Sequence, residues 1–296
     1  MVVCITGASG LVGSELTARL KQAGHEVLAV SRSRDKAGVV HWDPARGELD
    51  ADTLRGVDAV VHLAGENIAS GRWTEARKAR IRSSRVQGTR LIAETIARMS
   101  EPPATLISAS AIGYYGDRGN EVCTESSPPG EGFLADVCRE WEAACDPAEK
   151  AGVRVCKLRI GVVLDRKGGA LAKMLTPFRF GLGGIVGSGR QYWSWITLED
   201  LTGMFQFLLD NPQLSGVFNA VAPEPVTNKE FTRTLGRVLR VPTLFPLPPF
   251  LARMALGEMA DALLLASTRV VPERMQQAGF NYRHPVLEEA LRSILS

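Results

Sequence analysis

The sequence predicts an α/β fold in which a doubly wound parallel sheet carries a small C-terminal cap. Three observations support this fold class. Short apolar runs alternate with amphipathic stretches over the first half of the chain, which is typical of βα units. The first apolar run, residues 2–6, leads into a glycine-rich turn and then a helical pattern. After residue 165 the sequence changes to glycine pairs and clustered aromatic side chains, which indicates a different kind of structure.

The predicted elements follow in a regular order. Strands are expected at 2–6, 26–31, 39–42, 59–63, 104–109 and 153–160, and helices near 11–23, 74–99 and 132–150. A helix at 198–210 and a strand at 217–221 follow the glycine-rich region. Because helices join parallel strands and cover both faces of their sheet, this order predicts a Rossmann-type fold. Four prolines between 242 and 249 mark a linker into a helical tail.

Composition and charge exclude several classes of protein. The chain has 296 residues, of which 45% are hydrophobic, enough for a large core. Its formal net charge of +3 is too small to indicate a nucleic-acid partner. No run of about 18 apolar residues predicts a membrane span, and the first residues do not have the pattern of a signal peptide. We expect a cytoplasmic protein with a small-molecule substrate and with neither nucleic acid nor a membrane as partner, and homodimer formation is left open.

The cysteines predict free thiols and no metal site. They are Cys4, Cys123, Cys138, Cys145 and Cys156. Their number is odd and their spacing matches no metal-ligand motif, which favours unpaired thiols in a reducing compartment.

The glycine-rich turn predicts a dinucleotide site. Glycines at 7, 10 and 13 let backbone N–H groups approach a pyrophosphate, and the helix N-terminus favours its negative charge. The second strand ends at Ser31 and Arg32, where NAD-binding proteins have an acidic residue. Since Arg32 can hold a 2′-phosphate and Ser31 can donate a hydrogen bond, the sequence predicts NADP(H). The alternative is that Arg32 and Arg34 are solvated loop charges.

Two further features complete the predicted organisation. The fourth strand ends with His62-Leu63-Ala64-Gly65, and small residues at the carboxyl edge of a sheet let a cofactor lie close, although a plain turn is the alternative. We expect an NADP-binding domain at 1–165 to which 196–222 return. Residues 166–195 and 223–296 are expected to form a smaller substrate or cap domain.

With these features the chain resembles the extended short-chain dehydrogenase/reductases, the class of nucleotide-sugar epimerases and dehydratases. The matching segments are Thr6-Gly-Ala-Ser-Gly-Leu-Val-Gly13, His62-Leu-Ala-Gly65, Val86-Gln-Gly-Thr89, Ser108-Ala-Ser-Ala-Ile-Gly-Tyr-Tyr-Gly116 and Leu158-Arg159. More narrowly, it is similar to an atypical "epimerase family protein" branch with its own C-terminal domain. That likeness rests on Gly65-Glu-Asn67, Arg72-Trp73, Trp141-Glu142, Pro177-Phe-Arg-Phe-Gly-Leu-Gly-Gly184, Gly187-Ser-Gly-Arg-Gln191, Trp195-Ile196 and Asp200.

The resemblance implies which residues contact the cofactor. They are Gly7, Gly10, Leu11, Val12 and Gly13 at the pyrophosphate, Ser31, Arg32, Leu63 and Ala64 beside the adenosine half, and Val163 near the nicotinamide. Gly65, which follows Ala64, is a further predicted cofactor-binding residue. Arg85 stands where relatives usually have an asparagine, one helical turn before Thr89. We expect Arg85 to reach the cofactor phosphates or ribose, and the alternative is a surface arginine.

The catalytic set that the resemblance implies is incomplete. It consists of a serine that polarises a carbonyl, a tyrosine that acts as acid and base, and a lysine four residues later. Ser110 fits the serine. The tyrosine and lysine positions hold Leu134 and Cys138, or in the neighbouring register a phenylalanine and a valine. The nearest phenols, Tyr114 and Tyr115, are therefore our catalytic candidates beside Ser110, and the alternative is that one packs in the core while the other is exposed.

Polar and aromatic residues elsewhere are weaker candidates. Arg190, Gln191 and the aromatic segment 192–195 could line a substrate pocket or simply pack the cap. Glu66 and Asn67 are expected either to bind the substrate or to form a turn. Asp200 is expected to cap or orient a helix rather than to act in catalysis.

Two functions remain open from the sequence. The first is an NADP(H)-dependent oxidoreductase or epimerase that acts on a small carbonyl or sugar-type substrate with an altered catalytic set. Without a lysine, its phenol would keep a pKa near the ordinary value of about 10 and so favour reduction over oxidation. The second is a non-catalytic NADP(H)-binding sensor or partner protein, which the missing tyrosine and lysine favour.

Overall fold

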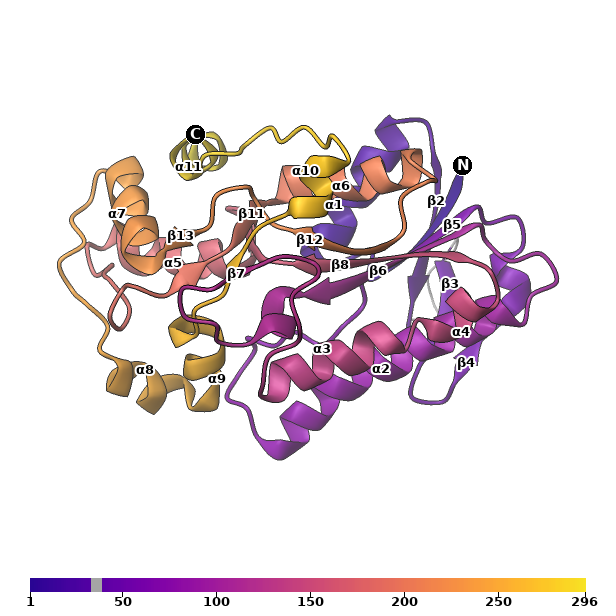
Figure 1. The fold of residues 1–296 in the computed structure, drawn as a ribbon, viewed down its shortest axis with the longest axis horizontal. Helices are drawn as coiled ribbons and strands as arrows, with labels where there is room; N and C mark the ends of the chain where they lie inside the picture. Colours follow the sequence, from indigo (N-terminus) through magenta and orange to yellow (C-terminus); the bar gives the residue numbers. More distant parts are fainter. Residues whose placement is uncertain (33–38) are drawn as a thin grey trace.

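An eight-stranded sheet forms the centre of the computed structural model, which describes residues 1–32 and 39–296 (Figure 1). In spatial order the strands are β12 (Gly216–Ala220), β8 (Arg154–Ile160), β6 (Thr105–Ala111), β5 (Ala59–His62), β1 (Val2–Thr6), β2 (Glu26–Ser31), β3 (Val39–Asp43) and β4 (Glu48–Leu49). All neighbouring pairs are parallel except β3 and β4. The order reverses on either side of β1, which places a ligand crevice at the carboxyl ends of β1 and its neighbours. The predicted fold class is confirmed.

Helices cover both faces of the sheet. The helices α1 (Leu11–Gln22) and α6 (Leu198–Asp210) pack together on one face, and α2 (Glu75–Ala97), α3 (Phe133–Ala143) and α4 (Asp146–Lys150) cover the other (Figure 1). The single helix predicted at 132–150 is wrong in one respect, because α3 ends at Ala143 and α4 begins at Asp146. Pro147 lies in the first turn of α4, where its missing N–H costs nothing, whereas inside a longer helix it would break a hydrogen bond.

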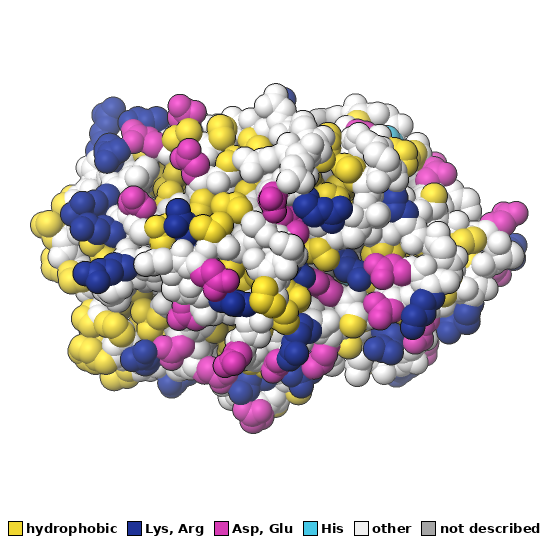
Figure 2. Space-filling model, in the orientation of Figure 1, with side chains coloured by type: hydrophobic (Ala, Val, Ile, Leu, Met, Phe, Trp, Pro, Cys, Tyr) yellow, Lys and Arg dark blue, Asp and Glu magenta, His cyan; other side chains and the backbone are white. Residues whose placement is uncertain are grey.

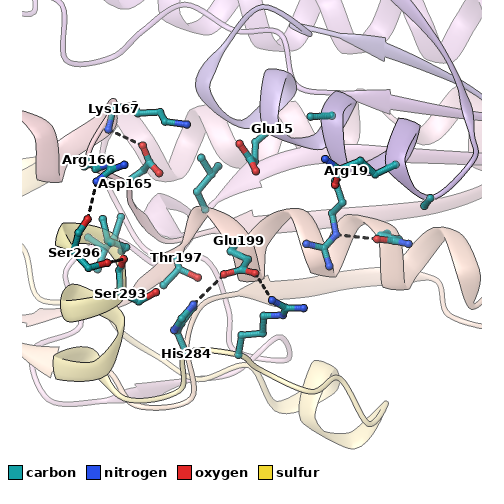
Figure 3. A pocket seen from close by; sticks show the side chains of 18 residues that line it. Glu15, Arg19, Asp165, Arg166, Lys167, Thr197, Glu199, His284, Ser293 and Ser296 are labelled. Carbon is teal, nitrogen blue, oxygen red and sulfur yellow. Dashed lines mark hydrogen bonds and ion pairs between the residues drawn. The ribbon is translucent and has the colours of Figure 1, made fainter.

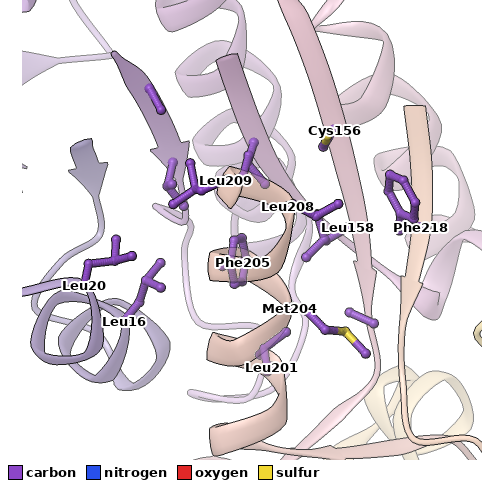
Figure 4. Close-up of a cluster of buried hydrophobic side chains, with 14 of the residues drawn as sticks. Leu16, Leu20, Cys156, Leu158, Leu201, Met204, Phe205, Leu208, Leu209 and Phe218 are labelled. Atoms are coloured by element: carbon purple, nitrogen blue, oxygen red, sulfur yellow. The ribbon is translucent and has the colours of Figure 1, made fainter. Parts of the chain in front are cut away.

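The main core lies between the sheet and the first pair of helices. Leu16 and Leu20 of α1 and Phe205 of α6 are fully buried against Leu158 of β8 and Phe218 of β12 (Figure 4). These apolar contacts hold α1, and with it the glycine-rich turn, in a fixed position on the sheet.

A separate core lies outside the main sheet. Between β8 and β12 the chain forms β9 (Val162–Leu164), α5 (Gly169–Arg179), β10 (Tyr192–Trp193) and β11 (Trp195–Thr197), and after β12 it forms β13 (Val226–Thr227), α7 (Asn228–Leu239) and α8 (Pro249–Leu256). Its last elements are α9 (Glu258–Ala260), η3 (Asp261–Leu265), β14 (Arg269–Val270), α10 (Glu273–Gln277) and α11 (Leu287–Leu295). Trp193, Trp195 and Phe231 are buried together in this core. The division into two domains at residue 165 stays a prediction. Contacts connect the two parts of the chain, since β14 pairs with β7 (Val122–Cys123) and α10 packs on β12.

The surface of the cap end carries exposed apolar side chains. Phe180, Leu244, Phe250 and Met254 are all well exposed, and hydrophobic atoms gather at the end of the molecule where α8 lies (Figure 2). Within the part of the chain that the structure describes, no helix is long and apolar enough to cross a bilayer.

Candidate functional site

The glycine-rich turn leaves room only for hydrogen at two positions. Gly7 has a φ of +68°, and a Cβ placed on it would lie 2.9 Å from the backbone nitrogen of Ala64. A Cβ on Gly13 would lie 2.2 Å from the Gly7 carbonyl oxygen. The cap residue of α1 is Gly10, so no side chain caps the helix, and its first turn carries no acidic residue. The N–H groups of this turn are therefore suited to an anionic ligand, which is the geometry that a pyrophosphate requires.

Thr6 and His62 lock the ends of β1 and β5 beside this turn. The Oγ1 of Thr6 accepts hydrogen bonds from the backbone nitrogens of Leu63 at 3.1 Å and Ala64 at 3.2 Å. Its own hydrogen is therefore directed to His62 Nδ1, 2.7 Å away. Burial, reinforced by the charge of Arg85, lowers the pKa of His62 to about 3. His62 thus stays neutral and orients the Thr6 hydroxyl, which in turn holds Leu63 and Ala64 beside the glycine turn, a role that sequence reasoning missed.

A second pair of glycines, Gly168 and Gly169, lies close to Leu11 and to the backbone of Val163. A Cβ on Gly168 would lie 3.2 Å from Leu11 Cδ1, and a Cβ on Gly169 would lie 3.2 Å from the carbonyl oxygen of Val163. The segment after β9 therefore reaches the start of α1, and two predicted cofactor residues lie on either side of Gly169. The glycine pair in the sequence was the signal for this close approach.

Arg85 lies inside the molecule and beside the predicted cofactor loop. Its Nη1 donates to the carbonyl oxygens of Glu66 at 3.0 Å and Ile81 at 3.2 Å, and its Cζ lies 5.1 Å from the ring centroid of Trp141. A Cβ on Gly65 would be 3.4 Å from that Cζ. Arg85 is partly buried, and these contacts favour the predicted position beside the cofactor loop over the surface alternative. Burial lowers the pKa of the guanidinium, but a group so basic remains charged.

The predicted 2′-phosphate site lies at the end of β2. Ser31 is the last residue of β2 and pairs with His41 of β3, and Arg32, the next residue, is exposed. Arg34 lies outside the described residues. A cation rather than a carboxylate therefore stands at this edge of the sheet.

Ser110 belongs to a buried network. Its hydroxyl donates to Glu142 Oε1 at 2.7 Å, and only 2% of Ser110 is exposed. Arg159 at the end of β8 binds both oxygens of the same carboxylate, Nε to Oε1 at 2.8 Å and Nη2 to Oε2 at 2.9 Å. Because the hydroxyl hydrogen is directed to Glu142, it is not free to polarise a substrate carbonyl. The role predicted for Ser110 therefore does not fit this geometry.

Tyr115 also requires a correction. It is fully buried, its hydroxyl lies 2.7 Å from Asn219 Oδ1, and it accepts a hydrogen bond from Arg159 at 3.0 Å. Burial raises the pKa of the phenol to about 12, so the expectation of an ordinary pKa is wrong here. Tyr115 has the environment of a core residue, as the alternative interpretation of the tyrosine pair allowed.

Tyr114 is the remaining phenol of the predicted set. Its ring meets that of Tyr115 edge to face at 5.4 Å, and the guanidinium carbon of Arg159 lies 3.3 Å from its centroid. Tyr114 is half-buried, which leaves part of the side chain accessible. The contact with the Arg159 guanidinium holds the Tyr114 ring in place, but it does not determine what the Tyr114 hydroxyl binds.

Leu134 and Cys138 lie together where the family resemblance places a tyrosine and a lysine. A Cβ on Gly113 would lie 3.2 Å from Leu134 Cβ and 3.8 Å from Cys138 Sγ, so both side chains face the turn η2 (Ile112–Tyr115). This geometry favours the first of the two registers. Burial raises the pKa of Cys138 to about 12, so its thiol does not act as a base near neutral pH.

The weaker candidates have structural partners. The Nε2 of Gln191 donates to the carbonyl oxygens of Val186 at 2.9 Å and Leu264 at 3.0 Å, and the tryptophans of the segment 192–195 pack in the cap core. The carboxylate of Asp200 accepts from the backbone nitrogens of Arg283 at 2.8 Å and His284 at 3.0 Å. The residue that caps α6 is Thr197, whose Oγ1 accepts a hydrogen bond from the Asp200 backbone nitrogen at 3.0 Å. The predicted capping role of Asp200 is therefore wrong, and its carboxylate instead holds the segment 283–284.

Two cavities lie near these elements. The larger, about 690 Å³, lies between α1, the start of α6 and the end of the chain, where Glu15, Arg19, Asp165 and Glu199 are among the residues that line it (Figure 3). The smaller, about 380 Å³, lies at the carboxyl edge of the sheet between η2, the start of α3 and the segment from α8 to η3. Gly113 and Leu134 border the smaller cavity, which makes it the candidate substrate site. In the described ranges no group of histidine, cysteine and acidic residues has the arrangement of a metal site.

Comparisons with known proteins agree with this geometry. The model of the "NAD dependent epimerase/dehydratase family" matches residues 3–220, and the "Domain of unknown function (DUF1731)" matches residues 247–294. The chain is 46% identical to the "Epimerase family protein Mb2239" of Mycobacterium bovis, over 98% of this chain and 96% of that protein. The crystal structure of the human "epimerase family protein SDR39U1 (isoform2) with NADPH" superposes with a TM-score of 0.90 at 35% identity and covers 99% of both chains.

Proposed function

Because the chain belongs to the NAD dependent epimerase/dehydratase family, we propose that it is an NADP(H)-dependent oxidoreductase acting on a small carbonyl or sugar-type substrate. The sequence resemblance is thereby confirmed for both the N-terminal domain and the distinctive C-terminal one. The observation that carries the proposal is the uncapped start of α1, where Gly7 and Gly13 have no room for a side chain.

Several features support NADP(H) as the cofactor. Gly7, Gly10, Leu11, Val12 and Gly13 would hold the pyrophosphate, and Arg32 would hold the 2′-phosphate. The remaining predicted contacts are Ser31, Leu63, Ala64, Gly65, Arg85 and Val163. The human relative is described with NADPH, the same form of the cofactor. When bound, NADPH supplies a hydride.

The residues at the carboxyl edge favour reduction over oxidation. Oxidation of an alcohol requires a base that takes the hydroxyl proton, and so does the first step of an epimerase that works through a ketone. Leu134 cannot take a proton, Cys138 has a pKa near 12, and Ser110 is engaged with Glu142. Reduction requires only a proton donor, which water can supply, as can Tyr114, which adjoins Gly113 of the cavity lining without itself lining the cavity. The chain is therefore better suited to reducing a carbonyl than to epimerising a sugar.

The test is consumption of NADPH with a panel of carbonyl compounds. We expect slow turnover that Tyr114→Phe lowers, because this substitution removes the donor hydroxyl and keeps the ring. Tyr115→Phe is the matched control, since its hydroxyl is buried and bonded to Arg159 and Asn219. It should lower stability more than turnover at a permissive temperature. If Tyr114→Phe kept full activity, Tyr114 would not be the proton donor.

A second candidate function is a protein that binds NADP(H) without turnover, as a sensor or as the partner of another protein. The apolar contact of Leu134 and Cys138 with Gly113 favours it, because it replaces the polar pair that the reaction of the family uses. If the protein binds NADPH tightly but consumes none of it with any carbonyl compound of the panel, the result would support this second function.

The compartment and the domain boundaries are part of the proposal. All five cysteines are free and buried, which supports a reducing compartment such as the cytoplasm, although one plant relative is named as chloroplastic. We also propose that 1–165 with 196–222 form the cofactor domain, and that 166–195 and 223–296 form the substrate or cap domain. Light scattering would determine whether the protein is a homodimer.

A further inference from the structure

The cavity at the carboxyl edge has an aromatic and aliphatic part and a charged part. Two aromatic side chains, Trp73 and Phe133, line it and meet edge to face with ring centroids 5.2 Å apart. The apolar part continues through Leu134 and Leu265. A ligand in this cavity therefore contacts aromatic and aliphatic surface on one side.

The charged part of the lining is mainly acidic. Its carboxylates are those of Asp117, Glu131, Glu258 and Asp261, and among the described residues its one cationic side chain is that of Arg253. The Nε of Arg253 donates to Asp261 at 2.9 Å, so this cation is already paired. Glu131 is exposed at the rim.

Cations just outside the lining do not reverse this balance. The Nζ of Lys78 lies 3.0 Å from Glu258 and 2.9 Å from Glu75, so it is shared between two carboxylates. It also lies 5.6 Å from the centroid of the Phe133 ring, which leaves the Trp73 ring, among the described lining residues, as the aromatic surface without a cation over it. Arg72 approaches the same corner, 3.6 Å from the position of a Cβ on Gly257. Acidic groups still outnumber basic ones in the described lining, which therefore carries a net negative formal charge.

We propose that this cavity takes a compact cationic molecule with an apolar body and rejects nucleoside diphosphate sugars. Aromatic faces attract cations through the ring quadrupole, and nearby carboxylates add to that attraction. The pyrophosphate of a nucleotide sugar would face Glu131 and Glu258 with no unpaired cation among the described lining residues, and like charges so placed act against binding. The volume of about 380 Å³ also suits a compact ligand. This inference rests on the proposed function only in taking the cavity as the substrate site.

The test uses aldehydes that differ in charge but share one ring. They are 4-(trimethylammonio)benzaldehyde, benzaldehyde and 4-formylbenzoate, with UDP-glucose as the nucleotide sugar. Each is titrated calorimetrically into the full-length protein loaded with NADP⁺, so that binding is measured without reduction. We expect the cation to bind about tenfold more tightly than the anion at low salt, the neutral aldehyde to lie between them, and UDP-glucose not to compete with the cation. The difference should shrink as salt is added.

Charge variants test whether the cavity causes this order. Glu131→Gln and Glu258→Gln should each weaken the cationic aldehyde several-fold and leave benzaldehyde nearly unchanged. Glu140→Gln is the matched control, because Glu140 is exposed on α3 and does not line the cavity. Equal effects of all three variants would show that long-range charge, rather than the cavity, sets the order, and would overturn the proposal.

The outcomes separate this inference from the proposed function. Charge-ordered binding without any consumption of NADPH would support the ligand class and contradict the reductase activity. Tighter binding of 4-formylbenzoate or UDP-glucose than of the cation, or no binding of the cation at millimolar concentration, would overturn the ligand class even if NADPH is consumed. If NADP⁺ itself does not bind, the proposed function fails, and the same titration of the cofactor-free protein decides the ligand class.

Discussion

The hydroxyl of Ser110 donates to Glu142 Oε1 at 2.7 Å, and both residues are buried at the carboxyl edge of the sheet. The same carboxylate receives two hydrogen bonds from Arg159. A serine that the family resemblance assigns to catalysis is thus part of a buried ion pair that joins α3 to β6 and β8. In this arrangement Ser110 stabilises the packing of α3 on the sheet, and its hydroxyl hydrogen is directed to Glu142 rather than to a substrate.

Removing parts of this network should lower stability in a graded way. We expect Ser110→Ala to lower the free energy of unfolding by about 1–3 kcal/mol, because it removes one hydrogen bond from a buried carboxylate. Glu142→Gln should cost more, about 3–5 kcal/mol, because it leaves Arg159 as a buried charge without its partner. Urea unfolding measures both, with the exposed serine variant Ser100→Ala as control. Unchanged stability of Ser110→Ala together with lost NADPH consumption would restore the catalytic role.

Arg32 should determine the preference for the phosphorylated cofactor. Arg32→Ala is expected to weaken NADPH binding by about 1–3 kcal/mol and to leave NADH binding nearly unchanged, because only NADPH carries the 2′-phosphate. Titration of cofactor fluorescence measures both affinities. Arg55→Ala removes an exposed arginine elsewhere and should have no effect. Equal affinity of the parent protein for NADH and NADPH would contradict the NADP(H) assignment.

Gly10 and Gly13, two of the three glycines of the turn, should differ in how well they tolerate a methyl group. Gly13→Ala places Cβ 2.2 Å from the Gly7 carbonyl oxygen, whereas Gly10→Ala places it 3.3 Å from the same atom. We expect Gly13→Ala to move the turn, to lose NADPH binding and to destabilise the protein by at least about 1–3 kcal/mol, the range for overpacking. Thermal unfolding with and without NADPH checks this, and a Gly10→Ala variant more damaged than Gly13→Ala would contradict it.

His62 should make stability depend on pH below neutrality. Its pKa is about 3 in the folded protein, against 6.5 as its ordinary value. Between these values the unfolded chain binds a proton that the folded chain does not, so stability falls as the pH falls, by up to about 1.4 kcal/mol per pH unit. His62→Gln removes this proton uptake. Urea unfolding from pH 7 to pH 5 should therefore show the difference in unfolding free energy between the parent and His62→Gln becoming smaller, and a difference that stays constant would contradict the prediction.

The five thiols should react only when the chain unfolds. All are buried, and burial raises the pKa of Cys4, Cys138 and Cys145 to about 12 and that of Cys156 to about 11. A thiol reagent should therefore modify the native protein slowly and titrate five groups in denaturant without reductant. Fewer than five groups would indicate a disulfide and contradict a reducing compartment.

Local patterns in the sequence predicted the fold and the start of the candidate site. The strand, the glycine turn and the helix of residues 2–22 are neighbours in the chain, so their order in the sequence predicted the strand, the turn and the uncapped helix that the structure has. The absence of a tyrosine and a lysine at 134 and 138 was also visible, because one helix holds both positions. These predictions needed no knowledge of distant contacts.

The sequence by itself determined a doubly wound sheet, an anion-binding turn and an incomplete catalytic set. Only the tertiary structure decided how the candidate side chains are used. Ser110 meets a carboxylate 32 residues away, and the hydroxyl of Tyr115 meets an amide 104 residues away. No periodicity links such positions, because they are brought together by the packing of α3, β8 and β12 around the sheet. The direction of a hydroxyl hydrogen, and with it the difference between a catalytic and a structural serine, follows from those contacts.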